Sequence, residues 1–208
     1  MQCKAGVESA AQDNQKELSI AEIHHAIRIL GTFIWNTHLK RALEEVDPDP
    51  KLNFWRIIYG TQLDMAVIEW CKLFGSDHEE HQPVHWKNTI PEKERDQFRN
   101  DLFKHLKLTP EKFREYWETV KNYRDNHAAH FNSEWLKPEN KPKYPTLDVA
   151  LEASYFYYPY LLNEFKKRGI EHHYPLDIRE YSERFSKQAI EVAAKAISAT
   201  ADIKEKVR

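Results

Sequence analysis

Residues 123–130 (YRDNHAAH) contain an arginine and a histidine, two residue types that could together cut an RNA backbone. Such a cut needs a group that exchanges a proton near pH 7, which suits His130. It also needs a fixed cation on the phosphate, and the planar guanidinium of Arg124 provides one. Asp125 and Asn126 would orient this pair or hydrogen-bond the ribose. No metal is required for this route.

Two further residues of the segment are candidate auxiliary groups. His127 lies one helical turn before His130, where it would act as a second acid or base or simply fill the inner face of the helix. Tyr123 directly precedes Arg124 and is the weaker candidate. Neither is required by the chemistry proposed for Arg124 and His130.

The helix that carries this segment must also position it. Its apolar stripe of Phe113, Trp117 and Val120 continues, in steps of three and four residues, to Arg124 and His127. A guanidinium on a core-facing stripe is costly unless an anion meets it. We therefore expect Arg124 to contact either an internal carboxylate or the phosphate of a ligand.

The spacing within the segment raises a geometric problem. Residues six apart on an ideal α-helix, as Arg124 and His130 are, point roughly 120° away from each other. Three arrangements would bring them together: the long arginine side chain, a distorted helix end, or a second copy of the chain.

The arginine–histidine motif resembles that of the HEPN superfamily, small helical domains that include many RNA-cutting toxins. The family pattern is arginine, four to six residues, then histidine; here five residues separate Arg124 from His130, and Asp125 fills the polar slot after the arginine. The segment is most similar to the abortive-infection group. This resemblance implies a helical bundle, a homodimer whose two motifs line one cleft, and an antitoxin as a further partner. Some members carry a tyrosine two residues after the histidine as a target for nucleotide transfer, but this chain has Asn132 there.

Composition predicts a single all-α domain. The chain has 208 residues, of which 41% are hydrophobic and 31% charged, and it contains only five glycines. We expect the domain to span residues 17–200, between flexible ends at 1–16 and 201–208. The net charge of −2 excludes a global basic field, so that RNA would have to meet a local patch.

Caps and breaks divide the chain into about six helices. Ser19 and Glu22 form a capping box, and Thr109 with Pro110 opens the motif helix. The expected helices are Ser19–Val46, a second after the 47–50 break that ends at Gly75, Pro91–Leu106, Thr109–Phe131, a fifth capped by Thr146 and closed by Gly169, and Asp177–Ala199. In the last helix, Val192 is among the residues expected to face the core.

Other titratable residues carry weaker signals. The loop histidines His78, His81 and His85 have a spacing that could hold zinc, but a solvated loop is the better interpretation. Two cysteines, Cys3 and Cys71, are expected to stay reduced. We expect no metal and no cofactor, no membrane segment, and a cytoplasmic protein.

Two alternatives to the ribonuclease remain. One is a catalytically silent HEPN-like module that binds RNA, a nucleotide or a protein partner. The other is a structural helical domain in which Arg124 forms an internal salt bridge and His130 only ends a helix. The silent module would bind RNA without cutting it, whereas the structural domain would lose stability without Arg124.

Overall fold

The chain folds into helices, and the all-α prediction is confirmed. The computed structural model describes residues 19–75, 83–129, 133, 137 and 144–204. Within these ranges there are seven α-helices and no strand. The α-helices, with one π-helical turn labelled η2, are α1 (Ile20–Val46), α2 (Asn53–Phe74), α3 (Trp86–Thr89), α4 (Glu92–Leu106), α5 (Pro110–Tyr123), η2 (Arg124–Ala128), α6 (Asp148–Lys167) and α7 (Ile178–Ala199).

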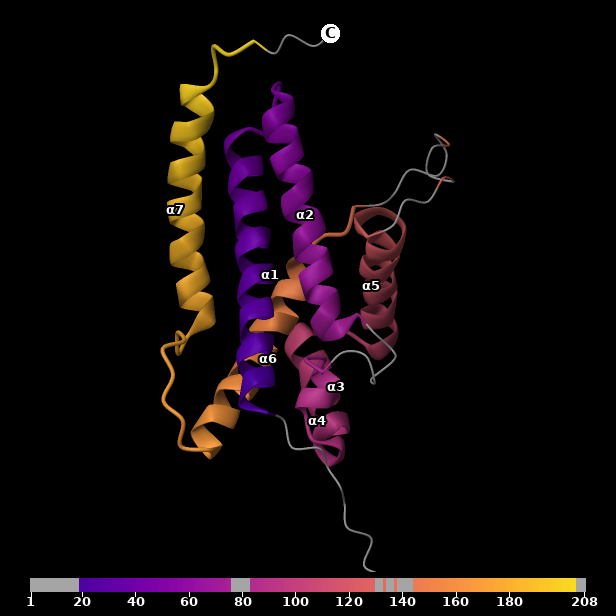
Figure 1. Cartoon of the computed structure of the whole chain (residues 1–208). Helices are drawn as coiled ribbons and strands as arrows, with labels where there is room; N and C mark the ends of the chain where they lie inside the picture. Colours follow the sequence, from indigo (N-terminus) through magenta and orange to yellow (C-terminus); the bar gives the residue numbers. More distant parts are fainter. Residues whose placement is uncertain (1–18, 76–82, 130–132, 134–136, 138–143, 205–208) are drawn as a thin grey trace, which may run out of the picture.

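The helix α1 lies at the centre of the bundle, between α2 and α7 (Figure 1). The helix α6 crosses obliquely behind the lower half of α1 and also contacts α4 and α7, while α5 packs against the C-terminal half of α2. Apolar side chains from all of these elements form one core cluster, with Leu30, Phe33, Trp70 and Tyr157 completely buried. The core extends almost to the η2 turn, since Val120 is buried as well.

Local caps explain where most helices begin. The capping box is present, because the Ser19 hydroxyl accepts from the Glu22 amide and the Glu22 carboxylate accepts from the Ser19 amide. Asp177 caps α7, and Thr109 caps α5 as expected. Two expectations were wrong. The cap residue of α6 is Leu147 rather than Thr146, and Val192 is 65% exposed because the neighbouring Ala193 turns inward instead.

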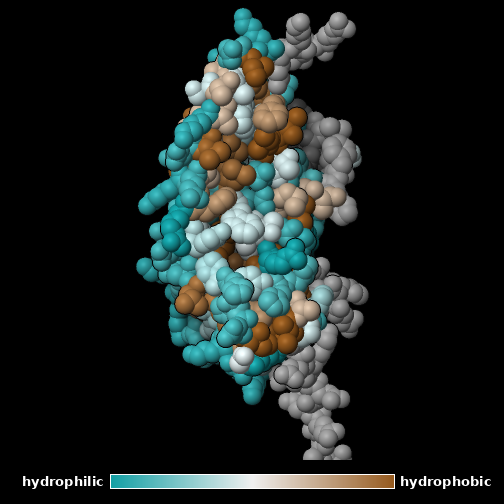
Figure 2. Space-filling view, turned by 60° about the vertical axis from the view of Figure 1, so that its left-hand side comes forward, coloured by the Kyte–Doolittle hydropathy of each residue, from teal (hydrophilic) through white to brown (hydrophobic). Residues whose placement is uncertain are grey.

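Apolar side chains also reach the surface. Figure 2 shows them gathered on one face in the upper half of the molecule and again near its lower end, with polar side chains between. The exposed large residues include Val192 on α7, Ile203 beyond it, and Leu176 before it. On α2, Phe54 is 58% and Ile57 is 67% exposed.

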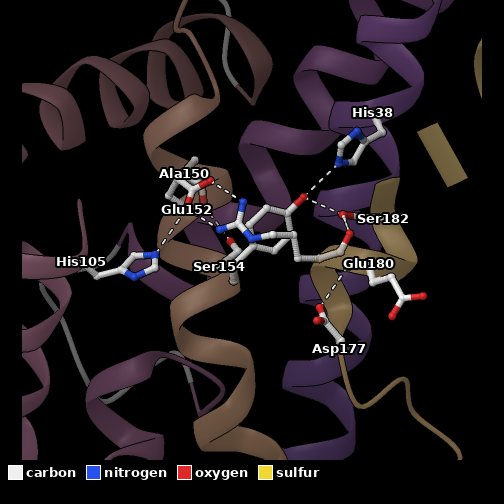
Figure 3. A network of polar contacts seen from close by, with 10 residues as sticks. His38, His105, Ala150, Glu152, Ser154, Asp177, Glu180 and Ser182 are labelled. Carbon is white, nitrogen blue, oxygen red and sulfur yellow. Dashed lines mark hydrogen bonds and ion pairs between the residues drawn. The ribbon is translucent and has the colours of Figure 1, made fainter. Parts of the chain in front are cut away.

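A polar network ties α1, α6 and α7 together where they cross (Figure 3). The Tyr155 hydroxyl lies 3.0 Å from His38 Nε2 on α1 and 2.7 Å from Ser182 Oγ on α7. Arg179 binds Glu152 through two hydrogen bonds of 2.6 and 2.8 Å and covers the Tyr155 ring at 4.3 Å. Because these buried and half-buried polar groups satisfy one another, the network fixes the register of α1, α6 and α7.

His38 makes this network sensitive to acid. Burial, reinforced by the charge of Arg41, lowers the pKa of His38 from 6.5 to about 4. Between these two values the unfolded chain holds more protons than the folded one, so the free energy of unfolding decreases as the pH falls. The full loss, reached below about pH 4, is roughly 3 kcal/mol.

We predict that His38→Gln will flatten this dependence, because glutamine keeps a polar group near Tyr155 but does not titrate. Urea unfolding of both proteins from pH 7.5 to 3.5 measures it. The hydrogen bonds from Arg179 lower the pKa of Glu152. Protonation of Glu152 in acid therefore destabilises both proteins equally. The difference between the curves therefore isolates His38, and parallel curves would contradict the prediction.

Candidate functional site

The backbone changes its geometry at the motif. The Thr109 cap and Pro110 start α5 as a regular α-helix, which ends at Tyr123. From Arg124 to Ala128 the chain forms a π-helical turn, in which the Ala129 amide donates to the Arg124 carbonyl at 2.9 Å. Such turns are rare, and they occur frequently at functional sites. A distorted helix end is one of the three arrangements that would relieve the divergence of Arg124 and His130.

Arg124 is held from two sides. Its Nε and Nη2 both lie 2.6 Å from Oδ1 of Asp125, and its Nη1 donates to the carbonyl of Gly75 at 3.2 Å. The Arg124 side chain is 24% exposed and that of Asp125 is 39% exposed. The carboxylate that meets Arg124 is therefore not an internal one but that of the next residue, which lies near solvent. A guanidinium oriented in this way and open to water can still receive an anion.

Gly75 is a partner of Arg124 that the sequence did not indicate. It caps the end of α2, where carbonyl groups lack helical partners and attract a cation. An added Cβ at this position would lie 2.6 Å from Cβ and 2.8 Å from Sγ of Cys71. Any side chain would therefore displace the carbonyl that binds Arg124. Burial raises the pKa of Cys71 to about 12, so its thiol stays protonated and is no nucleophile.

The other motif residues lie on different sides of the turn. Tyr123 is 2% exposed, and its hydroxyl donates to Asp64 on α2 at 2.7 Å, which places it in the core. His127 is exposed, and its ring lies 4.9 Å from that of Tyr123 and 6.1 Å from that of Tyr144. Asn126 donates to the Asn122 carbonyl at 3.0 Å. His130 lies outside the described residues, so its role stays a prediction.

The histidine loop falls largely outside the description as well. His78 and His81 are not described, whereas His85 is 1% exposed and caps α3 by accepting from the Lys87 amide at 3.3 Å. His85 is therefore a buried capping residue rather than part of a solvated loop. Across the described part of the chain, no three histidine, cysteine or acidic side chains are grouped to hold a metal. Nor is any described helix both long and apolar enough to cross a membrane.

The contacts of Arg124 predict a moderate stabilising role. An exposed ion pair contributes about 0.2–1 kcal/mol, and a hydrogen bond from a charged group contributes about 1.5–3 kcal/mol. We expect Arg124→Ala to lower the free energy of unfolding by roughly 1–3 kcal/mol, measured by urea denaturation. Lys195→Ala, which breaks an exposed pair on α7, is the control and should have almost no effect. A loss above about 4 kcal/mol would instead indicate a fully buried salt bridge.

Comparisons with family models, with curated proteins and with solved structures find no match to this chain. What Arg124 does must therefore be inferred from its contacts, its exposure and the chemistry of its neighbours.

Proposed function

We propose that this protein is a metal-independent endoribonuclease resembling the HEPN toxins of abortive-infection and toxin–antitoxin systems. The observation that supports this most directly is the Arg124 guanidinium, fixed at a π-helical turn by Asp125 and the Gly75 carbonyl and still 24% exposed. A cation that is oriented before the ligand arrives loses little entropy on binding it. We propose that the enzyme acts in the cytoplasm, where an antitoxin protein would restrain it.

In the proposed reaction the ribose 2′-hydroxyl loses its proton to a base, and its oxygen attacks the adjacent phosphorus. The bond to the 5′-oxygen then breaks, and that oxygen takes up a proton, leaving a 2′,3′-cyclic phosphate and a 5′-hydroxyl. His130 supplies one of the two proton transfers, with His127 a candidate for the other. Arg124 binds the phosphate oxygens, on which negative charge accumulates, while Asp125 and Asn126 orient the site.

A second copy of the chain would complete the site. The outward side of α2 carries an apolar stripe, opposite its buried side, in which Phe54, Ile57 and Met65 are 58%, 67% and 36% exposed. A helix that is apolar on both sides is typical of one buried between partners. Asp64, which binds Tyr123, directly precedes Met65. A two-fold pairing of these stripes would therefore bring two motif turns towards one cleft.

One observation favours the silent module as a second candidate. Asp125 already occupies the Nε and Nη2 side of Arg124, which is the side that a phosphate would contact with two hydrogen bonds. In a silent RNA-binding module, Asp125→Asn would free this side and strengthen binding. In the nuclease, Asp125 orients Arg124, so the same variant would weaken cleavage.

We predict that His130→Ala and Arg124→Ala each abolish RNA cleavage and any toxicity in cells. Loss of an acid or base costs about 10²–10⁴ in rate, and loss of a phosphate-binding donor costs about 10²–10³. Arg124→Lys should also fail, because a point charge does not replace the planar fork. Labelled RNA and gel separation provide the assay, and unchanged cleavage by His130→Ala would exclude the proposed mechanism.

Two controls test the chemistry itself. Cleavage should survive EDTA, because the proposed mechanism uses no metal; loss in EDTA with recovery on adding magnesium, manganese or zinc would overturn this. A single 2′-deoxy substitution before the cut bond should block cleavage at that position alone, since the attacking oxygen is then missing.

If the proposed dimer forms, two matched aspartate variants should differ in oligomeric state. Ile57→Asp on α2 should make the protein monomeric and reduce cleavage, because it places a charge in the proposed interface. Val192→Asp on α7, at a position of nearly equal exposure, should change neither. Light scattering at micromolar concentration measures the mass, and a fully active wild-type monomer would refute the dimer.

A further inference from the structure

A cavity of about 690 Å³ opens between α3, α4 and α5. Its volume lies within the range typical of small-molecule sites. Aromatic side chains form much of its wall. Trp86 and Phe98 stack with their ring centroids 5.2 Å apart, and Phe103 lies 5.3 Å from Phe113 across the α4–α5 contact. Trp117 completes the wall on α5. Phe98 itself is buried, but the partly exposed rings of Trp86, Phe103, Phe113 and Trp117 offer flat apolar surfaces suited to a planar ring.

The charge around this cavity is positive. Lys87, Arg99 and Arg114 line it, against the single carboxylate of Glu118. Arg99 pairs with Asp96 at 2.6 Å, but its side chain is still 50% exposed. Arg114 is also exposed. A planar ring that carries phosphate would match both the wall and its rim, and that combination is the chemistry of a nucleotide.

A row of side chains on α5 leads from the cavity towards the candidate site. Arg114, Trp117, Lys121 and Arg124 follow one another at steps of three, four and three residues, and so share one side of the helix. The Lys121 ammonium lies 4.8 Å from the centre of the Trp117 ring. At a rise of 1.5 Å per residue, the row extends about 15 Å. A stacked single strand covers that length with about four nucleotides.

Two consecutive carbonyls at the end of α2 hold two residues of this row, Trp117 beside the cavity and Arg124 at the candidate site. The Phe74 carbonyl accepts from Trp117 Nε1 at 2.6 Å, and the Gly75 carbonyl accepts from Arg124 Nη1 at 3.2 Å. The ring that faces the cavity and the cation of the candidate site are therefore held by adjacent residues. Their relative positions are set by a single helix end.

We infer that this cavity binds an unstacked base of single-stranded RNA, with the strand's phosphates running along Arg114, Lys121 and Arg124. This inference rests on the proposed function and states how the same site selects its RNA substrate. The base stacks against the aromatic wall, Arg99 and Arg114 bind its flanking phosphates, and the next nucleotides lead to the Arg124 turn. RNA is selected by being single-stranded, since a paired base cannot enter the cavity.

The test measures the binding of a fluorescent ten-nucleotide 2′-O-methyl RNA, which lacks the attacking hydroxyl, to the native protein by anisotropy. The double variant Arg99→Gln/Arg114→Gln should bind at least tenfold more weakly. Loss of two phosphate contacts should also reduce the slope of log K against log salt by about 1.4. The matched control Arg184→Gln/Lys195→Gln removes two exposed cations on α7 and should leave binding unchanged. Melting of every variant confirms that it is folded.

A second arm tests the base rather than the charge. One abasic position placed in turn along the RNA should weaken binding about tenfold at one position and little elsewhere. Weakening that is equal at all positions would overturn the base-binding cavity. Equal weakening by the α7 control would also overturn it. If AMP or GMP binds as tightly as the RNA and displaces it, the cavity belongs to free nucleotides and the RNA inference is wrong.

The cleavage assay separates this inference from the proposed function. Cavity-dependent binding without any cleavage of ordinary RNA would support the cavity and refute the nuclease. Cleavage that persists unchanged in the Arg99/Arg114 variant would support the nuclease and refute the cavity.

Discussion

The burial of α1 is the constraint on which the rest of the structure depends. This 27-residue helix contacts α2, α6 and α7, and its side chains are buried on several sides. Burying one large aliphatic side chain contributes about 1.5–3 kcal/mol. Its polar positions are satisfied at the same time: Thr37 donates to the Phe33 carbonyl, and His38 contacts Tyr155. Rotating α1 would expose the apolar groups and break the polar contacts together, so its orientation is fixed by both.

The position of the motif follows from that of α1 through a short series of contacts. α1 positions α2, and the last carbonyls of α2 hold Trp117 and Arg124. Tyr123 adds a further contact through Asp64. The orientation of the guanidinium is thus set by helix ends and buried groups, although Arg124 itself lies at the surface. This division is typical of functional sites, where a rigid scaffold orients a few exposed groups.

The features predicted from sequence were those encoded by neighbouring residues. The capping box at Ser19, the start of α5 at Thr109 and the all-α class depend on local hydrogen bonds and apolar periodicity, and all are present. The features that were missed depend on residues distant in sequence. Nothing in the motif indicates that Gly75 accepts from Arg124, and periodicity alone did not show that Ala193 rather than Val192 is buried on α7. The contact between Asp125 and Arg124 joins neighbours in sequence, and Asp125 was among the residues expected to orient the arginine.

The π-helical turn changes the relation between the number of residues after Arg124 and the direction in which each of them lies. In an α-helix the amide of residue 128 would bond to the carbonyl of Arg124, but here the amide of Ala129 does. One additional residue is therefore accommodated in the turn, and Ala129 is offset by about 100° from its place in a continuous α-helix. A chain with one residue fewer in this turn would reach the direction of Ala129 with a regular α-helical turn. A motif that varies by one residue in length can thus keep the direction of the backbone that follows it.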